Sequence, residues 1–325
     1  MSSPIATHCV HVLSSSKREL TVTGPMLAYS DPAYAASLRE FGTPRLLPAS
    51  GGWLLERAVP SSNDRDAMGC YPLFSAPHWD GLPDDLRALA PELVSLVLVT
   101  DPFGDVSASM LEGVPGVRLV PWKDHFVIDV QQPLATIGDQ GQRRNARRAA
   151  RSLQIEVADD PMQYVDDWVQ LYSNLSARFG LTGLRAMSPT ALAEQLQLSG
   201  AQLIVARQEG IVVAAHVYLQ RDDVAYLHLV GVTDEAYRLQ AAAGLTACAV
   251  EFFSARAQWL SLGAGAGATA SDEDGLSVFK RRWATHTRPT WLLSAVLDAP
   301  RYERLSVNVS TGYFPAYRAN ELATG

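Results

Sequence analysis

Two histidines and a tyrosine lie on neighbouring segments that the sequence predicts to be β-strands. His216 falls within 211–220 and His228 within 224–230, and the two-residue alternation of a strand places His228 on the same face as Tyr226. An imidazole or a phenol there can take a proton from an attacking nucleophile, directly or through water. The other interpretation is that each histidine is a hydrogen-bonded structural residue of its strand.

No other catalytic arrangement is indicated by residue types and spacing. The sequence has no Ser-His-Asp order, no cysteine in the context of a nucleophile and no spacing typical of metal ligands. Cys9, Cys70 and Cys248 are widely spaced and odd in number, which argues against a disulfide framework and is typical of a reducing compartment. We therefore expect direct attack without a covalent enzyme intermediate, no metal and no permanently bound cofactor.

Five arginines fall within nine residues, with no acid or lysine between them: Arg143, Arg144, Arg147, Arg148 and Arg151. If 142–153 is a helix, Arg143, Arg147 and Arg151 lie along one broad face. In a chain of net charge −7, such a face predicts binding of phosphates on a polyanion such as tRNA. The alternative is a solvated helix whose arginines pair with acids.

A glycine-rich segment, GAGAG at 263–267, precedes the basic triplet Lys280-Arg281-Arg282. Gly263 and Gly265 let the backbone approach a ligand closely because no Cβ intrudes. Nearby cations can then hold a phosphate or a carboxylate. Arg281 and Arg282 can equally be surface charges, and the acids at 272–274 can neutralise the cluster.

A third group of residues lies in the first third of the chain. A substrate pocket between two halves of the chain is one interpretation, since domain interfaces favour such clefts. Its candidate lining residues are Tyr71, His78 and Trp79, together with Asp101-Pro102-Phe103. These aromatic side chains can instead cover a hydrophobic core.

Few secondary-structure elements are predicted in the first third of the chain, which is frequently interrupted by Pro and Gly. Strands are expected at 53–56, 94–99, 117–120 and 125–130, with a corner at Pro121-Trp122. A short amphipathic helix is expected before the second of these strands.

The remainder has clearer periodicity. Helices are expected at 142–153, from Pro161 onward, from Ser188-Pro189 to about 198, at about 237–257 and at 276–283. The helix after Pro161 carries an apolar stripe that is predicted to be buried: Tyr164, Trp168, Leu171, Leu175 and Phe179. Strands are expected at 155–157, 202–207, 211–220, 224–230, 259–262 and 289–296. This order predicts an α+β fold, with a mixed, mostly antiparallel sheet flanked by helices.

Length and composition limit the class of protein. A chain of 325 residues predicts two domains or one large one, and 47% hydrophobic with 19% charged residues excludes a disordered, collagen-like or coiled-coil protein. No apolar stretch approaches the ~18 residues that span a bilayer, and the N-terminus has no apolar core of signal-peptide length. We expect a soluble, cytoplasmic protein without a membrane span; the sequence predicts no oligomeric state.

Four segments resemble the GNAT-type proteins allied to the Fem peptidoglycan-bridge aminoacyltransferases. They are LYSNLSARFGLTGLRAMSP (171–189), AYLHLVGVTDEAYRLQAAAG (225–244), WLSLGAGAGATASDEDGLSVFKRRW (259–283) and GYFPAYR (312–318). The resemblance covers roughly residues 120–320, and the glycine loop leading into DGLSVFKRRW is its most specific part. Fem-type proteins carry two GNAT-like halves. The resemblance therefore implies a divergent N-terminal half at 1–138, on the acceptor side, and a catalytic half at 139–325.

The resemblance implies an N-acyltransferase that forms an amide on an amine. Strand 224–230 is then expected to splay away from 259–262, and one of its backbone N–H groups to polarise the donor carbonyl. His228, Tyr226 or His216 would take the amine proton. Fem-type proteins regularly have a lysine at the glycine-loop motif, so Lys280 is the first candidate for donor binding, followed by Arg281 and the arginine helix. Tyr71, His78 and Trp79 would contact the acceptor.

The resemblance leaves two donors open, acyl-CoA and aminoacyl-tRNA. The CoA-binding turn, Q/R-x-x-G-x-G/A, cradles pyrophosphate at a helix start. Here 233–244 reads TDEAYRLQAAAG, with Asp234 and Glu235 at the phosphate position and a single late glycine. The two acids can also simply stabilise a helix N-terminus. We expect aminoacyl-tRNA, contacted at its acceptor end, with acyl-CoA as the alternative. The expected acceptor is an amine or hydroxylamine of a small molecule or of a cell-wall precursor. A non-catalytic GNAT-like binding module is the remaining interpretation.

Overall fold

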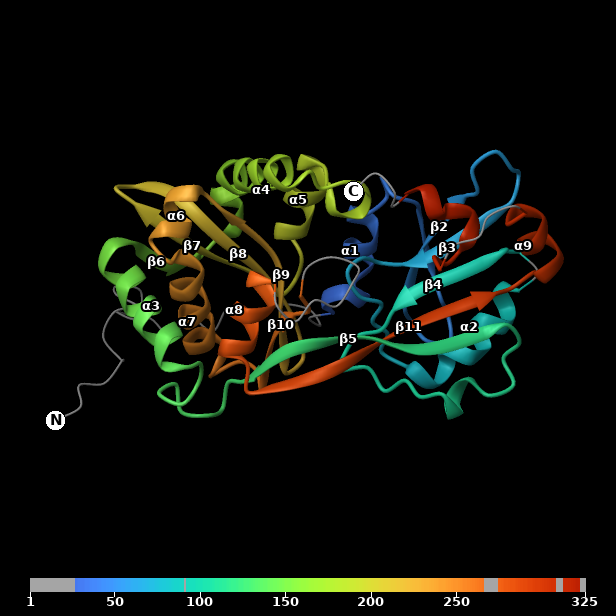
Figure 1. Ribbon diagram of the computed structural model, residues 1–325, viewed down its shortest axis with the longest axis horizontal. Coiled ribbons are helices and arrows are strands. Elements are labelled where there is room, and N and C mark those ends of the chain that lie inside the picture. Colours follow the sequence, from blue (N-terminus) through green and yellow to red (C-terminus); the bar gives the residue numbers. More distant parts are fainter. Residues whose placement is uncertain (1–26, 91, 266–273, 308–311, 322–325) are drawn as a thin grey trace. The chain divides into compact units, whose positions relative to one another are not determined.

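The computed structural model describes residues 27–90, 92–265, 274–307 and 312–321 (Figure 1). The chain forms two compact units, each assembled from segments that are distant in the sequence. Of the described residues, unit 1 takes those within 27–28, 124–179 and 192–288, and unit 2 takes those within 29–123, 180–191 and 289–321.

Unit 1 is built on a mixed sheet whose strands follow the order β5-β10-β9-β8-β7-β6. Neighbouring strands are antiparallel except β9 and β10, which are parallel. The strands are β5 (Val117–Asp129, of which Asp124 onward belongs to unit 1), β6 (Gln154–Val157), β7 (Ala201–Gln208), β8 (Ile211–Arg221), β9 (Val224–Val232) and β10 (Trp259–Gly263). The central strand β8 is buried over nine successive residues, which explains its nearly continuous apolar sequence.

Helices cover both faces of this sheet (Figure 1). They are α3 (Gln140–Ser152), α4 (Val165–Phe179), α5 (Pro189–Leu196, from Leu192 in this unit), α6 (Asp234–Arg238), α7 (Ala241–Phe253) and α8 (Gly275–Trp283). On one face, Phe253 of α7 packs against Tyr218 of β8, with ring centroids 5.3 Å apart. On the other face, α4 packs against β9, where a Cβ on Gly231 would lie 2.8 Å from Leu171 Cβ.

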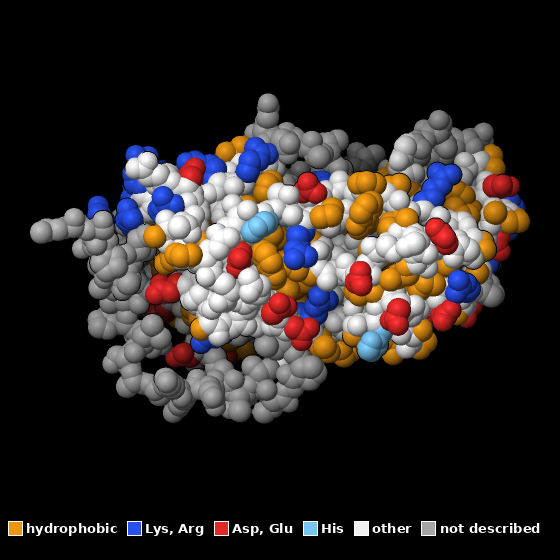
Figure 2. Space-filling model, turned by 90° about the horizontal axis from the view of Figure 1, so that it is seen from below, with side chains coloured by type: hydrophobic (Ala, Val, Ile, Leu, Met, Phe, Trp, Pro, Cys, Tyr) orange, Lys and Arg blue, Asp and Glu red, His pale blue; other side chains and the backbone are white. Residues whose placement is uncertain are grey.

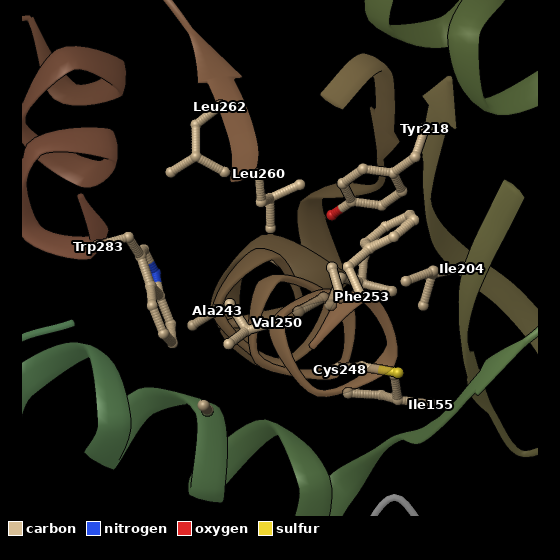
Figure 3. Close-up of a cluster of buried hydrophobic side chains, with 14 of the residues drawn as sticks. Ile155, Ile204, Tyr218, Ala243, Cys248, Val250, Phe253, Leu260, Leu262 and Trp283 are labelled. Carbon is tan, nitrogen blue, oxygen red and sulfur yellow. The ribbon is translucent and has the colours of Figure 1, made fainter. Parts of the chain in front are cut away.

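The core of unit 1 surrounds α7, with apolar side chains from β6, β7, β8, β10 and α8 converging on the helix (Figure 3). Helix α3 approaches α7 closely because both present small residues. A Cβ on Gly244 would lie 2.9 Å from the Cβ of Ala149 and 2.4 Å from Cδ1 of Ile155. Glycine at this position therefore permits the contact between α3 and α7.

In unit 2 the strands follow the order β1-β2-β3-β4-β11, and the unit has its own hydrophobic cluster. Only β3 and β4 run parallel among these pairs. The strands are β1 (Thr43–Leu46), β2 (Trp53–Ala58), β3 (Arg65–Gly69), β4 (Ser95–Val99) and β11 (His286–Val296, from Pro289 in this unit). The helices are α1 (Pro32–Ser37), α2 (Leu82–Leu89) and α9 (Ala299–Leu305).

The α+β fold and the mixed, mostly antiparallel pairing are as the sequence predicted, and three local expectations are wrong. There is no corner at Pro121-Trp122, because β5 runs unbroken and the Thr290 hydroxyl bonds both the N–H (3.3 Å) and the C=O (2.8 Å) of Lys123. The helix expected at 237–257 is two helices, since Gln240 has φ +62° and separates the exposed α6 from the buried α7. Phe179 is 64% exposed at the end of α4, and Tyr172 is buried instead.

The compact units also differ from the expected halves at 1–138 and 139–325. Residues 289–325 belong to unit 2, because Leu292–Val296 of β11 pair with β4. Arg318, which is buried, donates to both carboxylate oxygens of the buried Asp66 on β3, with Nη2 2.9 Å from Oδ1. That the first 138 residues descend from a GNAT-like half stays a prediction.

Candidate active site

Strands β9 and β10 lie side by side and then part, as the sequence predicted. Their parallel pairing covers Trp259↔Val224, Leu260↔Ala225 and Ser261↔Tyr226. Beyond that point β9 continues to Val232 with β8 as its partner, and β10 ends at Gly263 with a register shift against β5. After Tyr226, β9 is therefore no longer hydrogen-bonded to β10. A slot between the two strands requires this loss of pairing.

A β-bulge in β9 falls next to this divergence. Tyr218 of β8 is opposite Leu227 and Val217 is opposite Leu229, so His228 is an extra residue on β9. A bulge of this kind leaves the extra residue outside the regular ladder and re-aims its side chain. Tyr226, two residues earlier, is only 2% exposed.

His228 points toward α5, where its Nε2 lies 3.0 Å from Oε1 of Gln195. Both side chains are buried, and burial lowers the pKa of His228 to about 3. The imidazole is therefore neutral at neutral pH. Because the amide oxygen only accepts, Nε2 of His228 carries the proton and donates it to Gln195.

His216 lies on the opposite face of the sheet, the face covered by α7. Its Nδ1 is 3.1 Å from the hydroxyl of Tyr218. The pKa of His216 is lowered to about 3, first by burial and then by the positive charge of Lys280. The structure therefore separates His216 from His228 and Tyr226, and gives it Lys280 as a neighbour.

Lys280 and the start of the glycine loop come together as the sequence suggested. Asp274 caps α8 by accepting from the N–H groups of Leu276 and Ser277, each at 2.9 Å. One turn further along α8, Nζ of Lys280 donates to the carbonyl of Ala264 at 2.7 Å. Gly263 has φ +77°, and a Cβ there would lie 3.3 Å from that Nζ.

The other members of this motif have structural contacts. A Cβ on Gly265 would lie 2.0 Å from Oγ of Ser277, so this glycine lets the loop pass close to α8. Arg282 forms a two-pronged ion pair with Asp139, at 2.5 and 3.2 Å. The guanidinium of Arg281 is exposed and lies 5.8 Å from the centre of the Phe126 ring. Residues 266–273 of the loop, including Gly267, lie outside the described residues.

The arginine helix is α3, which begins after Asp139; that residue accepts the N–H of Gln142 at 2.7 Å. Gln142, Ala146 and Ala149 form its buried face. Arg143 is half-buried and donates to the carbonyl of Gly138, so it lies off the exposed face that was expected to include it. The exposed arginines are Arg144, Arg147, Arg148 and Arg151.

The acids expected at a phosphate-binding helix start are elsewhere. Asp234 and Glu235 begin the short α6, where Asp234 pairs with Arg178 and Glu235 pairs with Arg238. The first turn of α7 has no acidic residue. The two acids thus occupy a helix N-terminus, as the second interpretation of the sequence had it. That helix is the short α6 and not the long helix, because the break at Gln240 separates α6 from α7.

In unit 2 the three candidate acceptor residues have different environments. Trp79 is 7% exposed and packs edge-on against Phe74, with ring centroids 5.6 Å apart, so it belongs to the core. The side chain of His78 is exposed. Burial raises the pKa of Tyr71, and the charge of Arg185 opposes that rise.

A polar cluster beside Tyr71 was only partly indicated by the sequence. The buried Asp101 accepts from the Ser75 hydroxyl and from the N–H of Phe103, both at 2.9 Å. The buried Tyr29 has a raised pKa, first because of burial and then because of the charge of Asp101. Asp101-Pro102 after an apolar strand was a usable signal for this turn. Tyr29 stands in a segment with no distinctive pattern, and Arg185 was not singled out within the family-like segment 171–189.

The part of the chain that the structure describes contains neither a metal-binding cluster nor a membrane-spanning helix. No group of three His, Cys, Asp or Glu side chains there is placed to hold a metal ion. Likewise, none of the helices in those residues has the length and apolar character needed to cross a bilayer.

Comparison with known proteins identifies the fold. Residues 140–281 match the acetyltransferase (GNAT) domain family. The crystal structure of FemX is similar over 86% of this chain and 94% of that chain, with a TM-score of 0.65 and 12% identity. No curated protein sequence matches the chain.

Two further solved structures are similar over most of the chain. The C-terminal domain of a putative lysylphosphatidylglycerol synthetase from Agrobacterium fabrum has a TM-score of 0.61 and 17% identity, over 83% of this chain and 88% of that chain. L-PGS from Bacillus licheniformis has a TM-score of 0.55 and 15% identity, over 86% of this chain and 96% of that chain. At these identities the similarity concerns the fold alone.

Proposed function

We propose that this chain, which has a GNAT domain at residues 140–281 and a Fem-like fold, is an N-acyltransferase. It would transfer an aminoacyl group from tRNA to an amine. The observation that carries the proposal is the parting of β9 and β10 after Tyr226, with the His228 bulge beside it. In GNAT-type enzymes the acyl donor occupies this slot, and a backbone N–H of the bulged strand polarises its carbonyl. A backbone N–H that points at the developing oxyanion stabilises the tetrahedral intermediate.

The chemistry balances without a covalent enzyme intermediate. The amine nitrogen attacks the ester carbonyl, the C–N bond forms and the ester C–O bond breaks. One amine proton ends on the 3′-oxygen of the leaving tRNA. Both buried histidines have pKa values lowered to about 3, so each is a weak base for an amine proton. This favours an acceptor that arrives as the neutral amine or hydroxylamine and an enzyme that acts mainly by positioning.

Lys280 is the donor-side residue that we propose. Its ammonium is held at the end of β10 by the Ala264 carbonyl, next to the slot. There it can attract a phosphate or carboxylate oxygen of the donor.

An acyl-CoA donor is the second candidate, and one observation favours it. The first turn of α7 carries no acid, so the electrostatic objection to a pyrophosphate at this helix is removed. The Fem-like fold of the whole chain and the exposed arginines of α3 support the tRNA donor instead.

The test is to incubate the full-length protein with mixed aminoacyl-tRNAs or acyl-CoAs plus a panel of amines and hydroxylamines. We expect amine-dependent loss of the aminoacyl ester and a new amide detected by mass spectrometry. Lys280→Ala should reduce donor use, and Arg282→Ala on the same helix is the control, because Arg282 is occupied by Asp139. Consumption of acyl-CoA with a raised melting temperature would support the second candidate. No consumption of either donor would support a binding module.

A further inference from the structure

Helix α3 exposes four arginines on one side, at helical steps of three and four: Arg144, Arg147, Arg148 and Arg151. We call them the α3 arginine face. Within the part of the chain that the structure describes, none of the four side chains forms a hydrogen bond or an ion pair. Basic side chains gather at the left end of Figure 2, the end at which Figure 1 shows α3.

This absence of partners contrasts with other exposed arginines of unit 1. Arg178 pairs with Asp234, Arg238 pairs with Glu235, and Arg282 pairs with Asp139. The α3 arginines instead repel one another, because like charges three and four residues apart on a helix are destabilising. The sequence between Asp139 and Leu153 contains no acid that would relieve this repulsion. A helix that keeps such repulsion in a chain of net charge −7 is suited to an anionic partner.

The α3 arginine face is also rigidly placed. Ala146 and Ala149 are buried beneath it, and Ala149 packs against Gly244 in the first turn of α7. Helix α7 is the element that follows β9 through α6, so the arginines lie beside the helix at the donor end of the proposed slot.

Three features identify the anion. From Arg144 to Arg151 the helix rises about 10 Å, a length over which a nucleic acid duplex presents several phosphates. Between these two residues there is no apolar side chain larger than alanine, whereas helices that bind a membrane surface insert Leu, Phe or Trp. There is also no aromatic side chain on which an unpaired base could stack.

We propose that the α3 arginine face binds the backbone phosphates of the acceptor stem of the donor tRNA. This inference rests on the proposed function and extends it, because it assigns the surface that holds the duplex part of the donor. The 3′ end would enter the slot between β9 and β10, and the stem would lie along α3.

The test is a binding assay with a fluorescent, uncharged RNA hairpin that reproduces an acceptor stem, over a series of salt concentrations. The variant replaces Arg144, Arg147, Arg148 and Arg151 with Gln. Its matched control replaces Arg39, Arg87, Arg118 and Arg304, which are exposed residues of unit 2, with Gln. Both variants change the net charge from −7 to −11, so the amount of charge removed is the same and its place on the protein differs.

We expect the α3 variant to bind the hairpin ~100-fold more weakly near 0.1 M salt. Its slope of log K against log salt should shrink by about 4, since each of four lost phosphate contacts removes roughly one unit. The control variant should keep the affinity and slope of the wild type. The inference is overturned if the two variants weaken equally, or if the α3 variant binds as the wild type does. It is also overturned if the wild type binds phosphatidylglycerol vesicles through these arginines but does not bind the hairpin.

A second measurement separates this inference from the proposed function. A 3′-aminoacyl-adenosine donor lacks the stem, so the α3 variant should use it at the wild-type rate and lose rate with full aminoacyl-tRNA. Failure of hairpin binding together with normal use of the short donor would overturn only the α3 assignment. Hairpin binding without amide formation from either donor would overturn the proposed function instead.

Discussion

The imidazole of His228 and the amide of Gln195 form a buried hydrogen bond, with Nε2 3.0 Å from Oε1. The bond fixes the tautomer, so Nε2 has no lone pair left for a substrate proton. A proton-accepting role for His228 would therefore need Nδ1. The position of His228 in the β9 bulge gives the residue a second, structural task, which is to hold the bulged strand against α5.

The two buried histidines should make the protein less stable in mild acid. Burial lowers the pKa of His216 and of His228 to about 3, against 6.5 for the free side chain. Between these values the unfolded chain binds protons that the folded chain does not. The contribution of the two histidines to the free energy of unfolding should therefore have its full value above pH 6.5 and fall toward pH 3. Urea unfolding at pH 7.5, 6.0 and 5.0 measures this slope.

The double variant His216→Gln and His228→Gln is the matched comparison for that slope. It keeps a polar side chain at each position but removes both titrating groups, so its stability should vary much less over the same range. The carboxyls of Asp139, Asp274 and Asp298 have lowered pKa values, and their contribution is lost only at lower pH. An equally steep decline in the double variant would show that other groups cause it.

Gly263 should be costly to replace because of its backbone conformation. Its φ of +77° is a conformation that costs an L-residue about 1–2 kcal/mol, and a Cβ would crowd Nζ of Lys280 at 3.3 Å. Gly263→Ala should therefore lower stability by about that amount. Gly275→Ala is the control, because nothing lies within 4 Å of its Cβ position at the start of α8. It should be neutral or slightly stabilising. Thermal unfolding of the two variants provides the comparison.

Asp139 should matter more than its partner Arg282. The ion pair is about half exposed on both sides, so Arg282→Ala should cost no more than about 1 kcal/mol, and less in high salt. Asp139 also caps α3 through Gln142, and loss of a cap adds about 0.5–2 kcal/mol. Asp139→Asn should keep the cap and lose the charge. The expectation fails if Asp139→Ala and Asp139→Asn are equally destabilising in guanidinium titrations.

The periodic elements after residue 139 could be predicted because local signals and packing agree. Ser188-Pro189 starts α5 with the expected bond from Ala191 N–H to Ser188 Oγ at 3.2 Å. Glu209-Gly210 makes the turn between β7 and β8 with positive φ at both residues. The break at Gln240 could not be predicted, because helix propensity is high on both sides of it and the reason for it lies in the packing of α7.

The candidate site was only partly predictable for a related reason. Types and spacing located Lys280 beside Gly263, since both belong to one short stretch of sequence. Strand alternation gave the shared face of Tyr226 and His228. That His216 lies across the sheet follows only from the pairing of β8 with β9, because Leu219 is opposite Tyr226 and His216 is three residues away from Leu219. Trp79 was a candidate acceptor residue but fills the core. The sequence could not decide between the two, because an aromatic residue in a loop gives the same pattern in either place.

The link between Lys280 and His216 gives a final prediction. The pKa of His216 is lowered by burial and, second, by the charge of Lys280, whereas the pKa of His228 is lowered by burial alone. Lys280→Gln removes the charge, so the pKa of His216 should rise, yet stay below 6.5 because burial is the larger cause. The pKa of His228 should not move.

Nuclear magnetic resonance of the two labelled imidazole rings between pH 7.5 and the acid limit of folding measures both values in one sample. Lys280→Arg is the control, since it keeps the charge and should leave His216 as in the wild type. A parallel shift of both histidines would mean that the substitution loosens the fold of unit 1. An unchanged His216 would mean that the ammonium of Lys280 is too far away or too well solvated to act on the imidazole, and the electrostatic link between the two residues would then be wrong.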